Sequence, residues 1–218
     1  MLVAAAVCPP TPLVVLDMPD LRSACHAAVA GLAEARPDTL IVVGGAETTA
    51  SYDGTAAGTL RPWGVELATP GGGEPVLPLS LTVARLLLGD RTPDALRSVA
   101  FDAAPEECLA LGEKLAGGGD RVALLVMADG SACLSPRAPG RYDEAAGPLN
   151  DRIADAIATG DPAPLATLDP ASADRLWVSG RAALQVLAGV AGAHAYEGRL
   201  LMATAPYGVG YFAGSWLA

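Results

Sequence analysis

Three residues in the second half of the chain, Asp129, Ser131 and His194, are of the types that form a hydrolytic site. A serine hydrolase needs a nucleophile, a base and an acid that orients the base, and these side chains could supply all three. Ser131 does not stand in a G-x-S-x-G pattern, however, and the turn Asp129-Gly130-Ser131 is equally typical of a loop after a strand. We therefore expect this turn to recognise a polar ligand and not to form a catalytic triad.

Metal and thiol chemistry are limited by the number and spacing of ligands. The chain has two histidines, His26 and His194, and a 2-His-1-carboxylate iron site would need both beside an acid such as Glu47. Nothing in their spacing indicates such a group. The cysteines form no C-x-x-C pair, so the sequence contains neither a zinc knuckle nor a thioredoxin-type motif. We expect reduced, buried thiols at Cys8, Cys25, Cys108 and Cys133.

Glycine-rich pieces near the C-terminus do not form a nucleotide-binding motif. The segment from Gly208 to Gly214 has the wrong final spacing for G-x-G-x-x-G, and it lies between two predicted strands instead of before a helix. A phosphate-binding G-x-x-x-x-G-K-[ST] loop is excluded as well, because the single lysine, Lys114, lies inside a predicted helix. The sequence therefore does not support ATP as a ligand.

The polar turn at Asp129 follows a strong strand candidate, residues 122–127. These six residues form a continuous apolar run of the length expected for a strand that is buried on both faces. In an open α/β sheet, ligands bind at the carboxyl ends of such strands, because the loops there are exposed while the scaffold beneath is rigid. A functional site is therefore expected at and around Asp129.

Strands and helices are expected to alternate along the rest of the chain. The other predicted strands are 2–7, 39–43, 97–101, an edge strand at 63–68, and a closing hairpin of 199–205 with 209–216. The predicted helices are 20–35, 79–88, 106–115, 148–159, 170–177 and 180–192. Ser179 is expected to cap the last helix. Four prolines argue against a regular element between Cys8 and Pro19, and residues 46–59 are predicted to form a long loop.

This alternation predicts the fold class. We expect an α/β fold in a single domain, 1–218, with a mixed, mostly parallel sheet that is flanked by helices on both faces. Hydrophobic residues make up 51% of the chain and charged residues 17%, so the chain is too apolar to be disordered and can bury a sizeable core.

Charge and the first residues restrict the partners and the compartment. The formal net charge is −10 without a basic stripe, so a nucleic-acid backbone would be repelled. Residues 1–7 are apolar, but they lack a basic start and soon meet Pro9 and Pro10, so neither a signal peptide nor a membrane span is expected. We expect a cytoplasmic protein that binds neither nucleic acid nor membrane.

Five short segments together resemble one superfamily, in the order that the superfamily requires. They are MLVAAAVCPPTPL, LIVVGG, LLVMADGSA, SGRAALQVLAG and APYGVGYF, and they span nearly the whole chain. They resemble the class III extradiol ring-cleavage dioxygenases, in the LigB-like and Memo-like branch. The resemblance implies an α/β fold with its site at the strand ends. In the enzymes it also implies a ferrous iron held by two histidines and a glutamate, with another histidine as acid–base catalyst.

The chain departs from that implied pattern at nearly every position. The resemblance implies a histidine where Pro10 stands, another within 46–58, and the catalytic histidine where Ala132 stands. The third ligand, a cysteine in Memo-like proteins, falls at Ser179, and Glu47 is the nearest candidate acid after the second strand. Because a ferrous site without imidazole would be weak, we expect that the iron has been lost and predict no cofactor.

Three functional interpretations follow. The leading one is a dioxygenase-like protein that binds a small molecule or a partner in the former active-site cleft. The residues expected to line that cleft are Thr11, Glu47, Asp129, Ser131 and Tyr207. One alternative is a ring-opening Fe(II) extradiol dioxygenase, or one chain of such an enzyme whose partner chain supplies the histidines. The other is a structural subunit of a homo-oligomer, with the apolar stretch Tyr211–Trp216 as an exposed contact edge.

Overall fold

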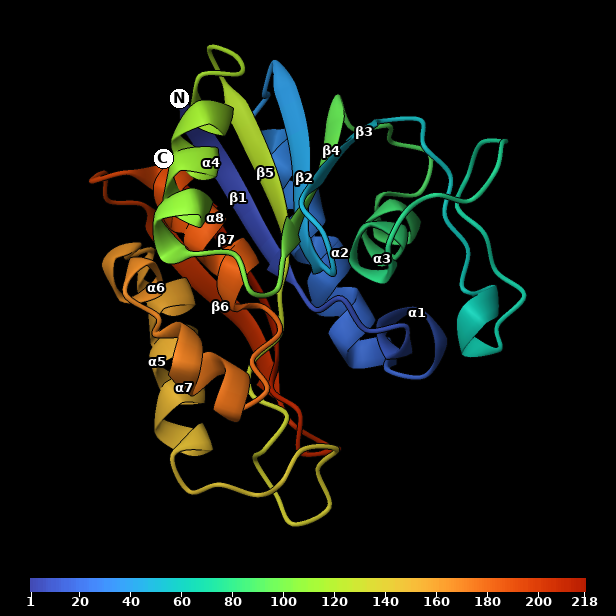
Figure 1. Cartoon of the computed structure of the whole chain (residues 1–218). Coiled ribbons are helices and arrows are strands. Elements are labelled where there is room, and N and C mark those ends of the chain that lie inside the picture. Colours follow the sequence, from blue (N-terminus) through green and yellow to red (C-terminus); the bar gives the residue numbers. More distant parts are fainter.

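Seven strands form one sheet at the centre of the molecule, in the order β3-β4-β2-β5-β1-β7-β6 (Figure 1). The computed structural model describes all residues from Met1 to Ala218. The strands are β1 (Leu2–Cys8), β2 (Thr39–Ala46), β3 (Ala50–Asp53), β4 (Ala95–Ala100), β5 (Val122–Met127), β6 (Glu197–Thr204) and β7 (Tyr211–Leu217). Four central strands are parallel, whereas β3 pairs antiparallel with β4, and β7 pairs antiparallel with both β1 and β6. The predicted mixed, mostly parallel α/β sheet is confirmed.

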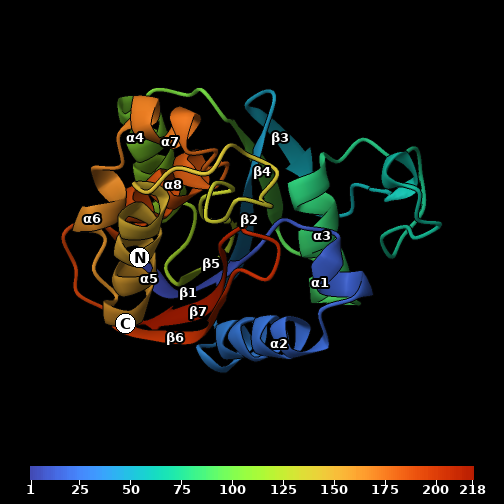
Figure 2. The same ribbon diagram turned by 90° about the horizontal axis from the view of Figure 1, so that it is seen from below.

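Helices cover both faces of this sheet (Figures 1 and 2). They are α1 (Leu13–Leu16), α2 (Pro19–Glu34), α3 (Leu79–Leu88), α4 (Pro105–Ala116), α5 (Ala146–Thr159), α6 (Ala163–Ala166), α7 (Pro170–Arg175) and α8 (Arg181–Ala191), with a 3₁₀ turn at Arg61–Trp63. One core lies between the sheet and helices α2 and α3, and the other lies between the sheet and helices α4, α5 and α8. These helices therefore pack on the two faces of the sheet, and the ends of the parallel strands lie between the two helical layers.

Strand β5 lies in the middle of the sheet because all six of its side chains are apolar. Val122, Leu124 and Val126 belong to the core beneath α8, whereas the alternate residues belong to the core beneath α2 and α3. Every residue of the strand is buried, as the continuous apolar run predicted. The strand therefore fixes the position of the turn that follows it, at Asp129.

The carboxyl ends of the four parallel strands meet at one edge of the sheet. Strand β5 pairs with β1 on one side and with β2 on the other, and β4 lies beyond β2. The loops that begin after Cys8, Ala46, Ala100 and Met127 therefore leave the sheet on the same side. Strand β7 runs antiparallel to β1, so it begins at this edge with Tyr211.

Three of the predicted elements are wrong in detail. The proline-rich stretch contains a one-turn helix, α1, because its prolines precede and follow Leu13–Leu16 without interrupting it. Residues 63–68 do not form a strand: a 3₁₀ turn ends at Trp63, and the Leu60 amide donates to the Leu67 carbonyl in an irregular loop. The antiparallel edge strand is instead β3, within the predicted loop 46–59, where four residues carry too short a pattern to be recognised.

The closing hairpin is confirmed, but its second strand is not an exposed edge. Strands β6 and β7 pair antiparallel, and β7 lies between β6 and β1. Phe212 and Trp216 are therefore buried, and the Trp216 indole Nε1 donates to the Ile157 carbonyl at 2.9 Å. The prediction that Tyr211–Trp216 form an exposed contact edge is wrong, because β6 pairs with the side of β7 that faces away from β1.

None of the helices combines the length and the apolar character that crossing a bilayer would require.

Candidate functional site

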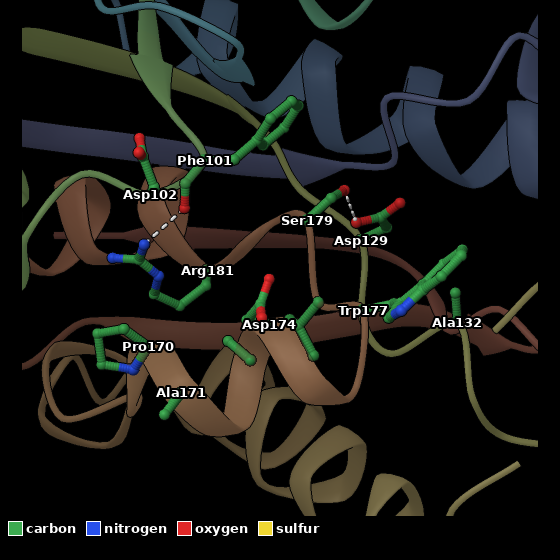
Figure 3. Close-up of a pocket in the computed structure, with 12 residues that line it drawn as sticks. Phe101, Asp102, Asp129, Ala132, Pro170, Ala171, Asp174, Trp177, Ser179 and Arg181 are labelled. Carbon is green, nitrogen blue, oxygen red and sulfur yellow. Dashed lines mark hydrogen bonds between the residues drawn. The ribbon is translucent and has the colours of Figure 1, made fainter. Parts of the chain in front are cut away.

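Two adjoining pockets lie at the carboxyl edge of the parallel strands, and we refer to them together as the strand-end cleft. The larger has a volume of about 630 Å³ and the smaller about 300 Å³. Both are lined by Phe101, Asp129, Ala132 and Ser179. The larger pocket extends toward α7 and α8 (Figure 3), and its other lining residues are Asp102, Pro170, Ala171, Ala173, Asp174, Trp177, Val178 and Arg181.

Asp129 stands where the two pockets meet. Ser179 Oγ donates a hydrogen bond of 2.6 Å to Asp129 Oδ1, and the two side chains face each other in Figure 3. Burial raises the pKa of the Asp129 carboxyl to about 6, although hydrogen bonds from Ser179 and from backbone amides, including that of Gly180, act in the opposite direction. At neutral pH the cleft therefore holds a mostly ionised carboxylate in a poorly solvated place.

The chain can bring Ser179 to Asp129 because residue 180 is glycine. A Cβ atom at Gly180 would lie 2.4 Å from the Asp129 carbonyl oxygen, which is too close for any side chain. Gly180 is the N-cap residue of α8, and no side chain caps that helix. Ser179 was predicted to be the cap, and this is wrong because its hydroxyl donates to the carboxylate instead of accepting from the helix.

Arg181 fixes the first turn of α8 to the loop between β4 and α4. Its side chain is buried, and its guanidinium Nη1 donates to the Ala103 carbonyl at 2.6 Å and to Gln185 Oε1 at 2.9 Å. Its Nη2 donates to the Phe101 carbonyl at 2.6 Å. No carboxylate pairs with this cation. Arg181 therefore holds the wall of the larger pocket through neutral acceptors.

Two large apolar side chains of the larger pocket are exposed. Phe101 has 43% of its surface exposed and Trp177 has 56%, and they lie on either side of the Ser179–Asp129 pair in Figure 3. Trp177 also has a φ of +52°, in the left-handed region that bulky residues rarely adopt. The backbone strain at this position costs on the order of 1–3 kcal/mol. Such strain is often found where a side chain is held for a function.

The smaller pocket is lined by hydroxyl groups beside Asp129. Thr11, Ser80 and Tyr211 contribute to its wall, and Ser80 Oγ donates to the Gly45 carbonyl at 2.7 Å. Burial raises the pKa of the Tyr211 phenol, the hydrogen bond with the Thr11 side chain lowers it, and the negative charge of Asp129 raises it further. The phenol therefore stays protonated near the Asp129 carboxylate.

The structure brings only part of the predicted site together. Thr11 and Asp129 line the cleft, as the position of their loops predicted. Ser131 is fully buried, and its hydroxyl donates to the Leu176 carbonyl and accepts from the Cys133 amide, so it supports the turn from below. Glu47 is exposed and lines neither pocket, and Tyr207 lines a separate hollow beside Ser135, Pro136 and Arg137.

Sequence reasoning missed the contributions of Phe101, Trp177, Arg181 and Tyr211. Phe101 could have been found by applying the strand-end rule to β4, because it is the first residue after that strand. The other three come from the segment before α8, from α8 itself and from an antiparallel strand. Their arrival at the cleft depends on the topology, and no local pattern marks it.

The residues of the cleft do not fit a ferrous ion. The positions at which the resemblance implies ligands or the catalytic base hold Pro10, Ala132 and Ser179, and Asp129 is the one carboxylate that lines both pockets. Nowhere in the chain do three His, Cys, Asp or Glu side chains come together in a group that could hold a metal ion. His26 and His194 are both exposed, and His194 follows the C-terminal end of α8, whereas the cleft lies at the start of this helix, which is about 17 Å long at 1.5 Å per residue.

Comparison with known proteins defines the fold and leaves the function open. No family model matches the chain, and no curated protein matches it either. Among solved structures, the chain is similar to the uncharacterized protein JW3007 from Escherichia coli K12. The TM-score is 0.58 at 14% sequence identity, and the match covers 98% of this chain and 99% of that one. The likeness extends over the whole α/β fold and, at this identity, shows the fold alone.

Proposed function

We propose that the chain binds a small molecule in the strand-end cleft, on a fold related to the class III extradiol dioxygenases, and that it does not cleave aromatic rings with iron. The observation that carries this proposal is the Asp129 carboxyl group at the junction of two pockets, with a hydroxyl donor and aromatic walls beside it. The donor set supports the part of the proposal that concerns iron, because no histidine lines either pocket.

Each cleft residue has a binding role in this proposal. Asp129 accepts a hydrogen bond from a donor on the ligand, and Ser179 orients the carboxylate through its own donated bond. Tyr211 and Thr11 offer hydroxyl groups in the wall of the smaller pocket. Phe101 and Trp177 cover apolar parts of the ligand in the larger pocket.

The proposal is tested by mapping amide chemical shifts of the ¹⁵N-labelled protein in EDTA, with catechol, choline and benzoate as separate probes at millimolar concentration. We expect saturable shifts at Asp129 and at Ser179–Arg181 with at least one probe, and their weakening in Asp129→Asn. The Asp120→Asn variant, altered in an exposed loop before β5, serves as the matched control. If no probe shifts these amides, the cleft is not a small-molecule site.

The two alternatives make different predictions. A dioxygenase would take up stoichiometric Fe(II), alone or with a partner chain, and would then consume oxygen with catechol. We expect neither iron retention nor oxygen uptake from protein purified without a histidine tag, and ring opening would overturn the proposal. A structural subunit would sediment as an oligomer and would show no probe-dependent shifts in the cleft.

A further inference from the structure

The larger pocket of the strand-end cleft combines aromatic walls with an excess of carboxylates. Phe101 and Trp177 expose about half of their surface next to a cavity of about 630 Å³. Asp102, Asp129 and Asp174 also line this cavity, and none of them forms an ion pair. Aromatic rings that remain uncovered in a concave surface are typical of ligand-binding sites.

Arg181 does not balance these acids for an incoming ligand. It is the one cationic side chain that lines the pocket, and its guanidinium donates three hydrogen bonds to Phe101, Ala103 and Gln185. These bonds commit most of its donors to the wall of the pocket. Three carboxylates against one engaged guanidinium leave a negative field in the cavity, on a chain whose net charge is −10.

We propose that the larger pocket recognises an organic ammonium cation, whose alkylated head lies against Phe101 and Trp177 with its charge near Asp129. This inference rests on the proposed function, because it names the class of ligand for the same cleft. The face of an aromatic ring attracts a cation, and the attraction is worth about 0.5–2 kcal/mol per favourable contact. The carboxylates add Coulomb attraction for a cation and repel an anion of the same shape.

A matched series of ligands isolates the contribution of charge. The probes are choline, tert-butylethanol, in which a neutral tert-butyl group replaces the trimethylammonium group, and 3,3-dimethylbutanoate, which carries a carboxylate. All three are titrated calorimetrically into the full-length protein in EDTA at low salt. We expect choline to bind about 10-fold more tightly than tert-butylethanol, corresponding to about 1.4 kcal/mol, and 3,3-dimethylbutanoate to bind most weakly.

Two tryptophan variants assign the preference to the pocket. Trp177→Leu keeps an apolar wall but removes the ring face, so the ratio of the choline and tert-butylethanol affinities is expected to fall toward 1. Trp63→Leu replaces another exposed tryptophan, on the loop after β3, which does not line the cleft, and is expected to keep the wild-type ratio. Far-ultraviolet circular dichroism and thermal unfolding confirm that both variants are folded.

The outcomes separate this inference from the proposed function. If tert-butylethanol or 3,3-dimethylbutanoate shifts the cleft amides and binds as tightly as choline, the ammonium inference is overturned and the small-molecule site remains. If none of the three binds, the ammonium inference is overturned, and the catechol and benzoate maps then decide on the cleft. If Trp63→Leu lowers the ratio as much as Trp177→Leu, the preference does not arise in this pocket.

Discussion

At the scale of single residues, the cleft depends on a carboxyl group whose charged form is costly. The pKa of Asp129 is raised to about 6 from an ordinary 3.8, chiefly by burial. The other ionisable groups that line the two pockets are Asp102, Asp174 and Arg181 in the larger pocket and Tyr211 in the smaller. No cation pairs with the carboxylate. A residue that lowers the stability of the fold in this way is expected where the residue serves ligand binding and not folding.

The variant Asp129→Asn tests that cost. Because the pKa of the Asp129 carboxyl group is higher in the folded than in the unfolded protein, its protonated form favours folding. This contribution to the free energy of unfolding is fully present below about pH 4 and is lost as the pH rises through about 6. The asparagine amide removes this loss, and its oxygen can still accept the hydrogen bond from Ser179. We expect the variant to be more stable than wild type by about 1–3 kcal/mol above pH 7 and equally stable near pH 4. Urea unfolding at several pH values measures the difference, and an advantage that does not change with pH would refute the burial argument.

The sequence indicated which residues line the cleft only where the strand-end rule applies. Asp129 and Thr11 follow parallel strands, and both line the cleft. Glu47 follows β2 in the same way, but it is exposed outside both pockets. Trp177 and Arg181 could not be assigned, because their position depends on how the chain between β5 and β6 packs against the sheet.

At the scale of elements, helix α8 is held against α4 by two glycines. A Cβ atom at Gly189 would lie 2.3 Å from the Leu109 carbonyl oxygen, and one at Gly112 would lie 2.3 Å from the Val186 carbonyl oxygen. The helices therefore approach so closely that their backbones touch. This contact fixes α8, whose first residue is Arg181, and with it the preceding segment that carries Ser179 to the cleft.

We expect Gly189→Ala to lower the free energy of unfolding by about 1–3 kcal/mol, because the new methyl group has to separate the two helices. Gly31→Ala is the matched control, since Gly31 lies in helix α2 and a Cβ atom there would meet nothing within 4 Å. The control is expected to be more stable than wild type by about 1 kcal/mol, through its higher helix propensity. Equal effects at the two positions in chemical denaturation would show that the α4–α8 contact is not tight.

Arg181→Met removes the donors that join α8 to the loop after β4. The carbonyls of Phe101 and Ala103 would lose these donors within a largely buried region, so we expect a loss of about 2–4 kcal/mol of stability. Arg181→Lys is expected to recover only part of this loss, because one ammonium group cannot reproduce the forked donors. If the lysine variant were as stable as wild type, the geometry of the guanidinium would not matter at this position.

Element-level prediction worked best for long apolar patterns. Strand β5 and the closing hairpin were recognisable because their apolar patterns extend over six or more residues. Strand β3 and helix α1 were missed because each has only four residues, and their form is set by pairing with β4 and by flanking prolines. The burial of β7 was missed as well, because strand order is not encoded in any single strand.

At the scale of the whole molecule, the topology explains why the cleft lies where it does. The parallel strands β1, β2, β4 and β5 direct their carboxyl ends to one edge, and the antiparallel β7 begins there. The sequence predicted this α/β class from the alternation of elements, and the likeness to the Escherichia coli protein extends over the same architecture. What the sequence could not predict is the aromatic and acidic lining of the larger pocket, which comes from segments far apart along the chain.

The most direct test of a small-molecule cleft that works without iron is a crystal structure of the wild-type protein grown with choline and EDTA. We predict electron density for the trimethylammonium group between Phe101 and Trp177, with its charge near Asp129 and no metal ion in the cleft. A cleft that holds only water at saturating choline, or a metal ion that persists there despite the chelator, would contradict the account.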